Sequence, residues 1–371
     1  MSEGAAQAAG SQRTVVRVPP TIDAAGLRDV TAALQAFLDS VPDGATIEFP
    51  DSARYRAEGG LAFVNRRGLT LEGHGATILA TTDGRAVPWP QGLGGSRKRW
   101  PRTRRHLLFV GGENIAVRNL VIKGAHPAGG VGEAAYVKAL EAQHGFEFRG
   151  VQGVELDRVT VTDVYGDFVY LGGYAGSWTR KVHIHDSRFE RNGWQGIAVT
   201  WAEDVLIERN HLGQSRRAML DLEPHNEQGG ARRIVVRNNT FGPGRLFFLA
   251  SKGRGSNIED VTIEGNRLSR ALNIYVVPPS GHRRARFRIV NNVSEDRQGG
   301  PPGLFFYMGS PPALMTFERI DGLEVRGNTN RLPFAPQMIG VRASESCRVI
   351  VTANDFPGAT QDSEVHPHGC P

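Results

Sequence analysis

The feature that most constrains this chain of 371 residues is a repeat that starts near residue 107. One series of short apolar runs aligns on a residue that is followed three positions later by asparagine, at spacings of 29, 27 and 26 residues. The aligned pairs are Ile207 with Asn210, Val236 with Asn239, Ile263 with Asn266 and Ile289 with Asn292, and Val325 with Asn328 extends the series. Self-similarity at such a period indicates a solenoid of stacked units.

A second series of apolar runs falls between the members of the first. The runs are FEF (146–148), VYL (169–171), IAV (197–199), LDL (220–222), FFL (247–249) and IYV (274–276). Each run is too short for a helix, and the period is too short for a βαβ unit of about 30 residues or more. We therefore expect coils that carry two or three short strands each, stacked about 4.8 Å apart. The 46 glycines and 21 prolines suit the many turns of such a chain.

The N-terminal part offers a cap for the open end of the solenoid. Asp29 is a suitable N-cap, and the residues after it show helical spacing of apolar side chains, so we expect a helix over about 29–39. Segments 45–50 and 69–80 read as first coils. The recurring asparagines are expected to stack into a hydrogen-bonded ladder with a structural role.

This combination of a cap helix and coils of the type VRNLVI resembles the right-handed parallel β-helix proteins of the pectate-lyase-like family. The resemblance implies an all-β fold, a right-handed parallel β-helix solenoid with an N-terminal capping helix. We expect a single β-helix domain over 21–352, with a flexible N-terminus (1–20) and a C-terminal tail (353–371). In proteins of this family, glycan binds in a groove along the outer face.

Charge is concentrated in one segment. The formal net charge is +6, but loop 84–106 holds seven basic residues and no acidic one, so the rest of the chain is close to neutral. The loop reads as a solvated surface segment or as a flap that meets an anionic substrate. It also contains Trp89 and Trp100, yet no nucleic-acid module accompanies it, so nucleic acid is an unlikely partner.

Side chains on the second series of runs define candidate binding positions, because alternate strand residues point to opposite faces. With the apolar flanks pointing inward, one outward column is Glu147, Tyr170, Ala198, Asp221, Phe248 and Tyr275, and a second is Arg149, Gly172, Thr200, Glu223, Ala250 and Val277. From these columns and their neighbours we expect substrate-binding roles for Glu147, Arg149, Trp194, Gln195, Trp201, Arg217 and Lys252.

Candidate catalytic residues centre on the segment DLEPHNE (221–227). Asp221 and Glu223 lie two apart on one strand, with Cα atoms expected about 6.5–7 Å apart, and can act as acid and base. Glu223-Pro224-His225 is similar to the Asp-Pro-His signature of mannuronan C5-epimerases, which implies proton transfer by Glu223 and His225. The acid is Glu rather than Asp, and Leu220 stands where that family has a tyrosine. Tyr170 is the nearest phenol along the repeat.

Asp167 precedes a strand at the edge of the same sheet, in a segment that resembles the Asp-rich segment of polygalacturonase-like enzymes. That family doubles the Asp, whereas this chain has Phe168. Asp167 alternatively caps a turn. No cofactor is expected, except that Glu147, Asp167, Asp221 and Glu223 together are chemically suited to Ca²⁺. His183, His185 and His211 read as isolated surface residues, so no other metal site is expected.

The favoured function is a carbohydrate-active lyase or epimerase that abstracts a sugar proton. The alternatives are a glycoside hydrolase with paired carboxylates, a cytoplasmic isomerase or cyclase of a small metabolite, and a non-catalytic glycan-binding solenoid. The expected partner is a saccharide or small molecule, in particular an anionic one, and not a membrane, because no apolar run is long enough to span one. The start of the sequence shows no secretory signal, so we expect a cytoplasmic protein unless a signal has been removed.

Overall fold

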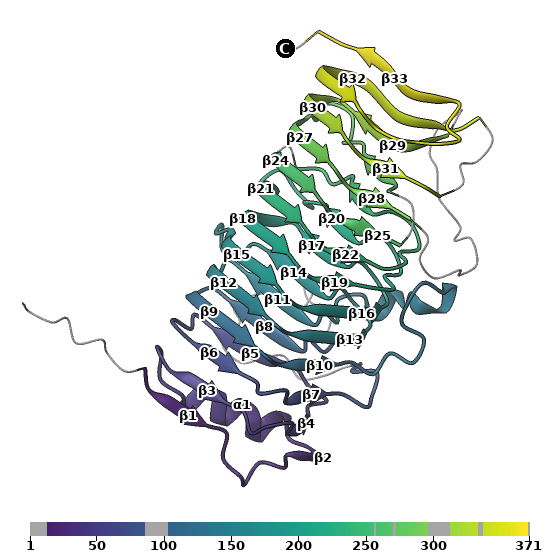
Figure 1. The fold of residues 1–371 in the computed structure, drawn as a ribbon. Coiled ribbons are helices and arrows are strands. Elements are labelled where there is room, and N and C mark those ends of the chain that lie inside the picture. Colours follow the sequence, from purple (N-terminus) through teal and green to yellow (C-terminus); the bar gives the residue numbers. More distant parts are fainter. Residues whose placement is uncertain are drawn as a thin grey trace, which may run out of the picture.

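The chain winds into a parallel β-helix in the computed structural model, which describes residues 13–85, 103–255, 257–269, 272–295, 312–332 and 337–369. Each coil contributes one strand to each of three parallel sheets, and the coils stack into an elongated body (Figure 1). The predicted fold class is therefore confirmed.

The three sheets are named here by their order along each coil. The first sheet contains β5 (Leu61–Val64), β8 (Leu107–Val110), β11 (Phe146–Arg149), β14 (Val169–Gly172), β17 (Ile197–Val199), β20 (Leu220–Leu222), β23 (Leu249–Ser251), β26 (Ile274–Val276) and β29 (Ala313–Glu318). The second sheet contains β1 (Val15–Arg17), β3 (Thr46–Glu48), β6 (Thr70–Glu72), β9 (Glu113–Arg118), β12 (Gln152–Asp157), β15 (Thr179–His185), β18 (Trp201–Glu208), β21 (Gly230–Arg237), β24 (Asn257–Glu264), β27 (Arg284–Val290) and β30 (Ile320–Arg326). The third sheet contains β2 (Ala25–Asp29), β4 (Arg54–Arg56), β7 (Thr77–Leu79), β10 (Val121–Lys123), β13 (Thr160–Val164), β16 (Arg188–Asn192), β19 (His211–Leu212), β22 (Thr240–Phe241), β25 (Arg267–Leu268), β28 (Val293–Ser294) and β31 (Thr329–Asn330).

The core consists of the inward side chains of all three sheets, stacked coil on coil. Phe63, Phe109 and Phe148 occupy equivalent inward positions on successive strands of the first sheet, with ring centroids 4.5 and 4.8 Å apart. Each such ring is nearly fully buried. The inward positions recur at the same place in every coil, so one repeated pattern of apolar residues is enough to fill the core from coil to coil.

The asparagine ladder forms as predicted, at the corner between the second and third sheets. The side-chain oxygen of each asparagine accepts bonds from the backbone N–H and side-chain amide of the asparagine one coil earlier, at 2.9–3.0 Å. The ladder runs through Asn210, Asn239, Asn266, Asn292 and Asn328, and it continues to Asn354. These amides satisfy buried backbone groups at the turn, which explains their structural role.

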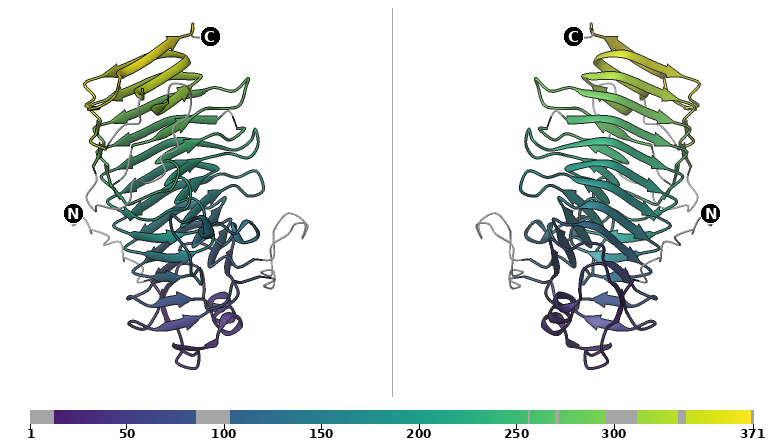
Figure 2. Two further views of the ribbon diagram at one scale, coloured as in Figure 1. Left: turned by 90° about the vertical axis from the view of Figure 1, so that its right-hand side faces the viewer. Right: turned by 90° about the vertical axis from the view of Figure 1, so that its left-hand side faces the viewer.

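Both ends of the solenoid are covered (Figure 2). Helix α1 (Thr31–Ser40) lies across the N-terminal end, and its Gln35 amide exchanges hydrogen bonds of 2.9 and 2.8 Å with the backbone of Ala62 on β5. The N-cap is Val30 and not Asp29 as predicted, although the Asp29 carboxylate accepts the Thr31 N–H at 3.0 Å just before the helix. At the other end, β32 (Ile339–Thr352) passes from the first sheet to the second, and β33 (Gln361–Pro367) pairs with it.

The chain ends are more regular than the sequence suggested. Strand β1 pairs with β3 inside the segment expected to be flexible, because its residues complete the edge of the second sheet. Strand β33 and the buried Phe356 lie inside the expected C-terminal tail. Among the described residues, no helix has the length and apolarity needed to cross a membrane.

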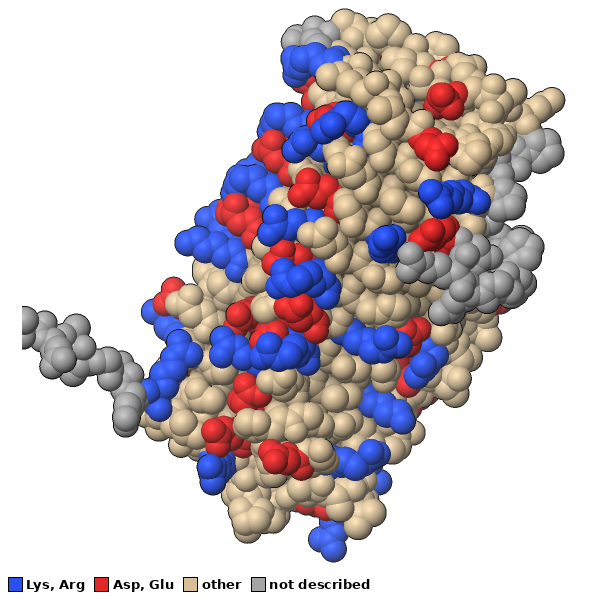
Figure 3. All heavy atoms as spheres, viewed as in Figure 1, with Lys and Arg blue, Asp and Glu red and all other residues tan. Residues whose placement is uncertain are grey.

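Charged side chains gather over the second sheet (Figure 3). Arginines and acids of successive coils pair there, as Arg209 does with Asp186, Arg233 with Asp204 and Arg286 with Asp260. Each of these residues is substantially exposed, so each pair contributes about 0–1 kcal/mol. The charge balance of this face therefore gives it little net preference for anions or cations.

Candidate active site on the first sheet

Strand register places the candidate residues in a column on the outer face of the first sheet. Glu147, Tyr170, Ala198, Asp221 and Ala250 lie opposite one another on successive strands. The prediction that Phe248 belongs to this column is wrong. Strand β23 begins at Leu249, two residues later than the run FFL suggested, and Phe248 packs in the core at 2% exposure.

The centre of the candidate site is a pair of carboxyl groups from Asp221 and Glu223. Asp221 lies on β20 at 5% exposure, Glu223 follows the strand and is half-buried, and their carboxyl groups are hydrogen-bonded to each other. Burial and then the charge of Glu223 raise the pKa of Asp221 well above its ordinary value. Two carboxyl groups in direct contact hold one proton more tightly than either does alone, so the pair is suited to proton transfer.

An aromatic stack brings a cation to this pair. The Arg217 guanidinium lies 4.6 Å from the centroid of the Trp194 ring, and Tyr136 stacks on the same indole at 4.4 Å. The charge of Arg217 lowers the pKa of Asp221, against the effect of burial. Tyr136 belongs to the segment between η1 (Glu133–Ala135) and η2 (Lys138–Leu140), which passes beside the sheet. The structure thus brings together the predicted residues Trp194, Arg217, Asp221 and Glu223.

Glu147 does not line an open groove, contrary to the prediction that it binds substrate. It is fully buried between two guanidinium groups, with Arg105 Nε at 3.1 Å and Arg149 on its other oxygen. Burial favours the neutral acid, but the charges of Arg149 and Arg105 outweigh it and hold the pKa of Glu147 at about 2. Arg149, the outer member of this triad, is half-buried. Its guanidinium carbon lies 4.6 Å from the centroid of the Tyr170 ring.

The proposed Ca²⁺ site from four carboxylates is not formed. Glu147 is engaged by its two arginines and lies three strands away from Asp221, which is about 14 Å. The one group of side chains in the described residues whose spacing suits a metal lies elsewhere, where Asp157, His185 and Asp186 have ligand atoms within 4.8 Å of one another. His185 is therefore not isolated, as the sequence suggested. Arg158 and Arg209 already neutralise those acids, however.

Asp167 lies in a buried chain of hydrogen bonds across the corner between the third and first sheets. Its Oδ1 accepts the Gln195 N–H at 2.9 Å, and its Oδ2 is 3.3 Å from Nδ1 of His144. Gln195 in turn accepts the Ala218 N–H at 2.8 Å, so it serves the backbone rather than an open groove. Burial, followed by the charges of Asp221 and Glu147, raises the pKa of Asp167 well above its ordinary value. The capping alternative for Asp167 is thereby realised.

His144 was not predicted, although it contacts two predicted residues. Burial lowers its pKa to about 3, and its ring stacks on Tyr170 with centroids 4.8 Å apart. Its Nδ1 accepts the Asp167 N–H at 3.1 Å. No local signal marks His144, because its partners lie on the next coil.

The remaining predicted residues surround the carboxyl pair at different depths. Tyr170 is 9% exposed and its hydroxyl accepts a hydrogen bond from Thr200 at 3.0 Å. Trp201 is half-buried and fills the space beside Gly173 and Gly229, where an added Cβ would lie 1.9 and 2.3 Å from its ring, so its role is packing. His225 is exposed on the turn after β20, and Lys252 is exposed one coil further on.

The end of the basic loop is part of the core, which corrects the description of 84–106 as a solvated segment. Arg104 is fully buried and donates to the Glu58 carbonyl at 2.9 Å and the Thr82 carbonyl at 2.8 Å, while Arg105 belongs to the Glu147 triad. Two of the seven cations are thus structural. Residues 86–102, which include Arg97, Lys98, Arg99 and Arg102, lie outside the described residues.

Comparison with known proteins supports the fold. Residues 108–292 match a family model described as a right handed beta helix region. No curated protein matches the chain. The surface protein and adhesin PfbA of Streptococcus pneumoniae is 13% identical with a TM-score of 0.59, covering 95% of this chain and 100% of that one. The family 28 exopolygalacturonase of Yersinia enterocolitica is 17% identical with a TM-score of 0.55, covering 96% and 78%.

A third solved structure is the tailspike protein of E. coli bacteriophage HK620, as a mutant in complex with a pentasaccharide. It is 13% identical with a TM-score of 0.56, covering 96% of this chain and 65% of the tailspike chain. At these identities the likeness shows a shared fold alone, because one fold carries many chemistries.

Proposed function

Because this chain is a right-handed parallel β-helix protein, we propose that it is a carbohydrate-active enzyme that moves a proton on a saccharide bound at the outer face of the first sheet. The observation that carries the proposal is the hydrogen-bonded pair of Asp221 and Glu223, in which the pKa of Asp221 is raised. A carboxyl group with a pKa moved toward neutrality serves well as a general acid or base near pH 7. Solved structures of the same fold include a polygalacturonase and a tailspike with bound pentasaccharide, which supports the choice of substrate class.

The carboxyl pair and the neighbouring Arg217 have different roles in proton abstraction. In its singly ionised form, the pair of Asp221 and Glu223 accepts a proton from carbon, and the half-buried Glu223 is the member nearer to solvent. The negative charge that develops on the sugar is stabilised by Arg217, which the ring of Trp194 holds in place. Loss of a leaving group from the neighbouring carbon gives a lyase, and donation of a different, solvent-derived proton to the opposite face gives an epimerase.

Hydrolysis is the second candidate, and one observation favours it. The charge of Asp221 contributes to the raised pKa of Asp167, so two carboxyl groups from different coils influence each other. Glycosidases place their two carboxyl groups about 5–5.5 Å or 6.5–9.5 Å apart. Asp221 and Glu223, which are in direct contact, are too close to flank a glycosidic bond. Asp167 would have to serve as the partner, and its burial at 2% exposure makes this less suitable.

The test compares three products from uronic-acid polymers and neutral polysaccharides. A lyase yields an unsaturated product that absorbs ultraviolet light, a hydrolase yields new reducing ends, and an epimerase incorporates solvent deuterium without cleavage. D221N and E223Q should each reduce the activity by at least a hundredfold, which is the range of general acid–base catalysis. E324Q, which alters a half-buried acid on β30 of the second sheet, is the control and should keep full activity.

Three results would overturn the proposal. If D221N and E223Q retain the activity of the unaltered protein, the assigned site is wrong. If no product forms while a saccharide binds, the protein is a glycan-binding solenoid. Turnover of a small metabolite with no saccharide binding would instead support the isomerase or cyclase alternative.

A further inference from the structure

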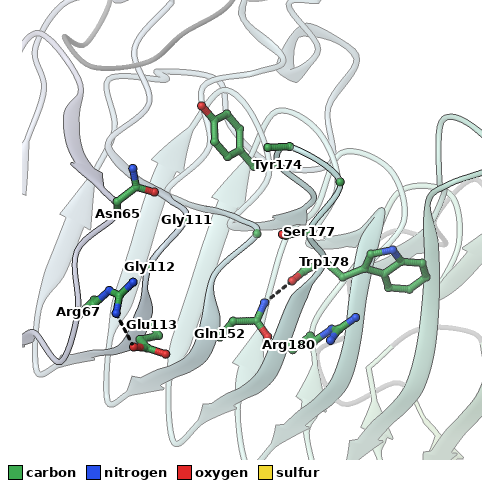
Figure 4. Close-up of a pocket in the computed structure, with 13 residues that line it drawn as sticks. Asn65, Arg67, Gly111, Gly112, Glu113, Gln152, Tyr174, Ser177, Trp178 and Arg180 are labelled. Atoms are coloured by element: carbon green, nitrogen blue, oxygen red, sulfur yellow. Dashed lines mark hydrogen bonds and ion pairs between the residues drawn. The ribbon is translucent and has the colours of Figure 1, made fainter.

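A cavity lies at the corner between the first and second sheets, and none of the residues of the carboxyl-pair site lines it (Figure 4). Its volume is about 510 Å³, within the roughly 300–1,000 Å³ of small-molecule sites. The side chains that shape it come from four successive coils, and they are Asn65, Arg67, Glu113, Gln152, Tyr174 and Arg180.

The cavity exists because one turn is longer than its neighbours. After β5, β8 and β11, the chain crosses the corner in a few residues, whereas after β14 the segment 173–178 forms a small hairpin. The hairpin is closed by Tyr174 N–H to Ser177 carbonyl at 3.0 Å and Ser177 N–H to Tyr174 carbonyl at 2.8 Å. It projects beyond the preceding turns and forms one wall of the cavity.

Glycines line the bottom of the cavity next to the hairpin, so no side chains fill the space there. Gly111 and Gly150 have φ of +62° and +65°. A Cβ on Gly150 would lie 3.2 Å from Cβ of Tyr174, so a larger residue there would push the hairpin away. The ring of Tyr174 is thereby left above the floor, opposite Asn65 and Arg67 (Figure 4).

Polar side chains of the cavity differ in how far they are engaged by other residues, and this decides which of them can bind a ligand. Arg67 is 69% exposed, and its Nη1 is 3.4 Å from Oε1 of Glu113, which is long for a charge-assisted bond of about 2.7–2.9 Å. Nε2 of Gln152 donates a hydrogen bond to the Trp178 carbonyl at 2.7 Å, and the side-chain oxygen of Gln152 lies on the side of Arg180 (Figure 4). Arg180, in contrast, is ion-paired with Glu203 of the next coil.

We propose that this corner cavity binds a sugar that carries a carboxylate, such as a uronic acid residue. The sugar carboxylate binds the guanidinium of Arg67, because a planar guanidinium can donate two parallel hydrogen bonds to a carboxylate. The apolar face of the sugar ring packs on Tyr174, and its hydroxyl groups bond to the amides of Asn65 and Gln152.

The cavity is a binding site separate from the carboxyl pair. The turn after β14 is two coils before the turn after β20, which is about 10 Å along the axis. The proposal assigns binding to this cavity and no chemical step. This proposal therefore does not depend on proton transfer by Asp221 and Glu223.

The test is isothermal titration of the full chain with trimers of galacturonic acid and of mannuronic acid, beside their neutral methyl esters. To prevent turnover at the carboxyl-pair site during the measurement, the titrations are repeated in the E223Q background, and binding at the cavity is recognised as the part of the affinity that R67Q and Y174A remove. R67Q should weaken binding of an acidic trimer at least tenfold, and Y174A should weaken it about fivefold or more. Y174F should bind the trimer like the unaltered protein. R17Q is the matched control, because Arg17 is also an exposed arginine of the second sheet, paired with Glu48 at 2.9 Å outside the cavity.

The methyl ester should bind the unaltered protein about as weakly as the acidic trimer binds R67Q. The ester should bind R67Q and the unaltered protein with equal affinity. Equal binding of acid and ester to the unaltered protein would overturn the proposal, as would R67Q and Y174A variants that bind like the control. Absence of binding by both acidic trimers would also overturn it. Because E223Q is present in every arm of the repeated series, loss of catalysis does not influence these outcomes.

Discussion

Two acids in the same column of the first sheet show that neighbouring charges, and not burial alone, decide how a carboxyl group behaves. Glu147 and Asp221 are both buried. Glu147 lies between Arg105 and Arg149, so its pKa is held at about 2. Asp221 faces a second carboxyl group, so its pKa is raised. The first arrangement favours structural stability, and the second favours proton transfer at some cost in stability.

Replacement of Glu147 by glutamine should destabilise the fold by about 3–5 kcal/mol at pH 7, because two guanidinium groups lose their buried partner. The pKa of Glu147 in the folded state lies below the ordinary glutamate value of about 4.5. Its stabilising effect is therefore present above pH 4.5 and is lost as the pH falls toward 2. Urea unfolding at pH 7 and pH 3 should show a smaller difference between E147Q and the unaltered protein at pH 3. Equal differences at both values would contradict the assignment.

Replacement of Asp221 by asparagine should have the opposite effect on stability. A raised pKa means that the folded state holds the proton more tightly, so Asp221 destabilises the fold increasingly as the pH rises above its unfolded value near 4. D221N should therefore unfold at a higher temperature than the unaltered protein at pH 7.5, with little difference at pH 4. Calorimetry at the two pH values measures this. A variant that is less stable at pH 7.5 would show that Asp221 is well paired rather than strained.

Two elements that repeat along the solenoid contribute to stability in different ways. The asparagine ladder is buried, and each amide bonds both to the next asparagine and to a backbone carbonyl one coil earlier, as Asn266 does to Asn292 and Val236. The charged ladder of the second sheet is exposed, so each of its ion pairs contributes little. The buried ladder should therefore dominate the coupling between coils.

Substitution of one ladder residue tests this difference. N266A leaves buried backbone and amide groups on two neighbouring coils without partners, so we expect a loss of about 2–4 kcal/mol. N354A removes the half-exposed last member and should cost about 1 kcal/mol or less. Chemical unfolding of the two variants, with D204N as an exposed control, gives the comparison. Equal losses for N266A and D204N would show that the ladder is not the stronger element.

At the scale of the whole molecule, the solenoid needs its ends covered, because every internal coil is paired on both sides and the last coil is not. Helix α1 covers the N-terminal end, where Gln35 bonds to the backbone of β5. Leu34 and Leu38 of the helix are buried in the core. These contacts shield both the open strand edges and the apolar interior.

A chain without residues 1–44 should therefore self-associate. It lacks β1, β2 and α1, so the edges of β3, β4 and β5 and the core beneath them become exposed. Size-exclusion chromatography with light scattering should show dimers or larger species, whereas a chain without residues 1–12 should behave like the full chain. A monodisperse monomer after deletion to residue 44 would mean that the remaining coils protect themselves.

The basic segment gives a second prediction at this scale. The variant R97Q/K98Q/R99Q/R102Q should weaken binding of an anionic saccharide and leave the melting temperature within about 2 °C. R104Q/R105Q should lower the melting temperature by several degrees, because Arg104 and Arg105 are buried partners of Glu58 and Glu147. Thermal melts and titration with an acidic trimer measure both effects. Unchanged binding by the quadruple variant would show that the charge of that segment is incidental.

The sequence by itself determined the repeat and therefore the fold. Spacings between apolar residues and asparagines are local properties of the chain, and a stacked coil is the structure that satisfies them at every turn. The sequence also identified Asp221, Glu223, Arg217 and Trp194, which the structure brings together. It placed β23 two residues too early, because the run FFLAS offers apolar residues in two registers.

Only the tertiary structure decided which charges are buried and what surrounds them. Arg105 reaches Glu147 across 42 residues of chain, and His144 meets Asp167 on the next coil. The corner cavity likewise depends on one hairpin standing beside three shorter turns. Such features arise between coils, where residues distant in sequence share one desolvated environment, and pKa values and cavities are properties of that environment rather than of any local pattern.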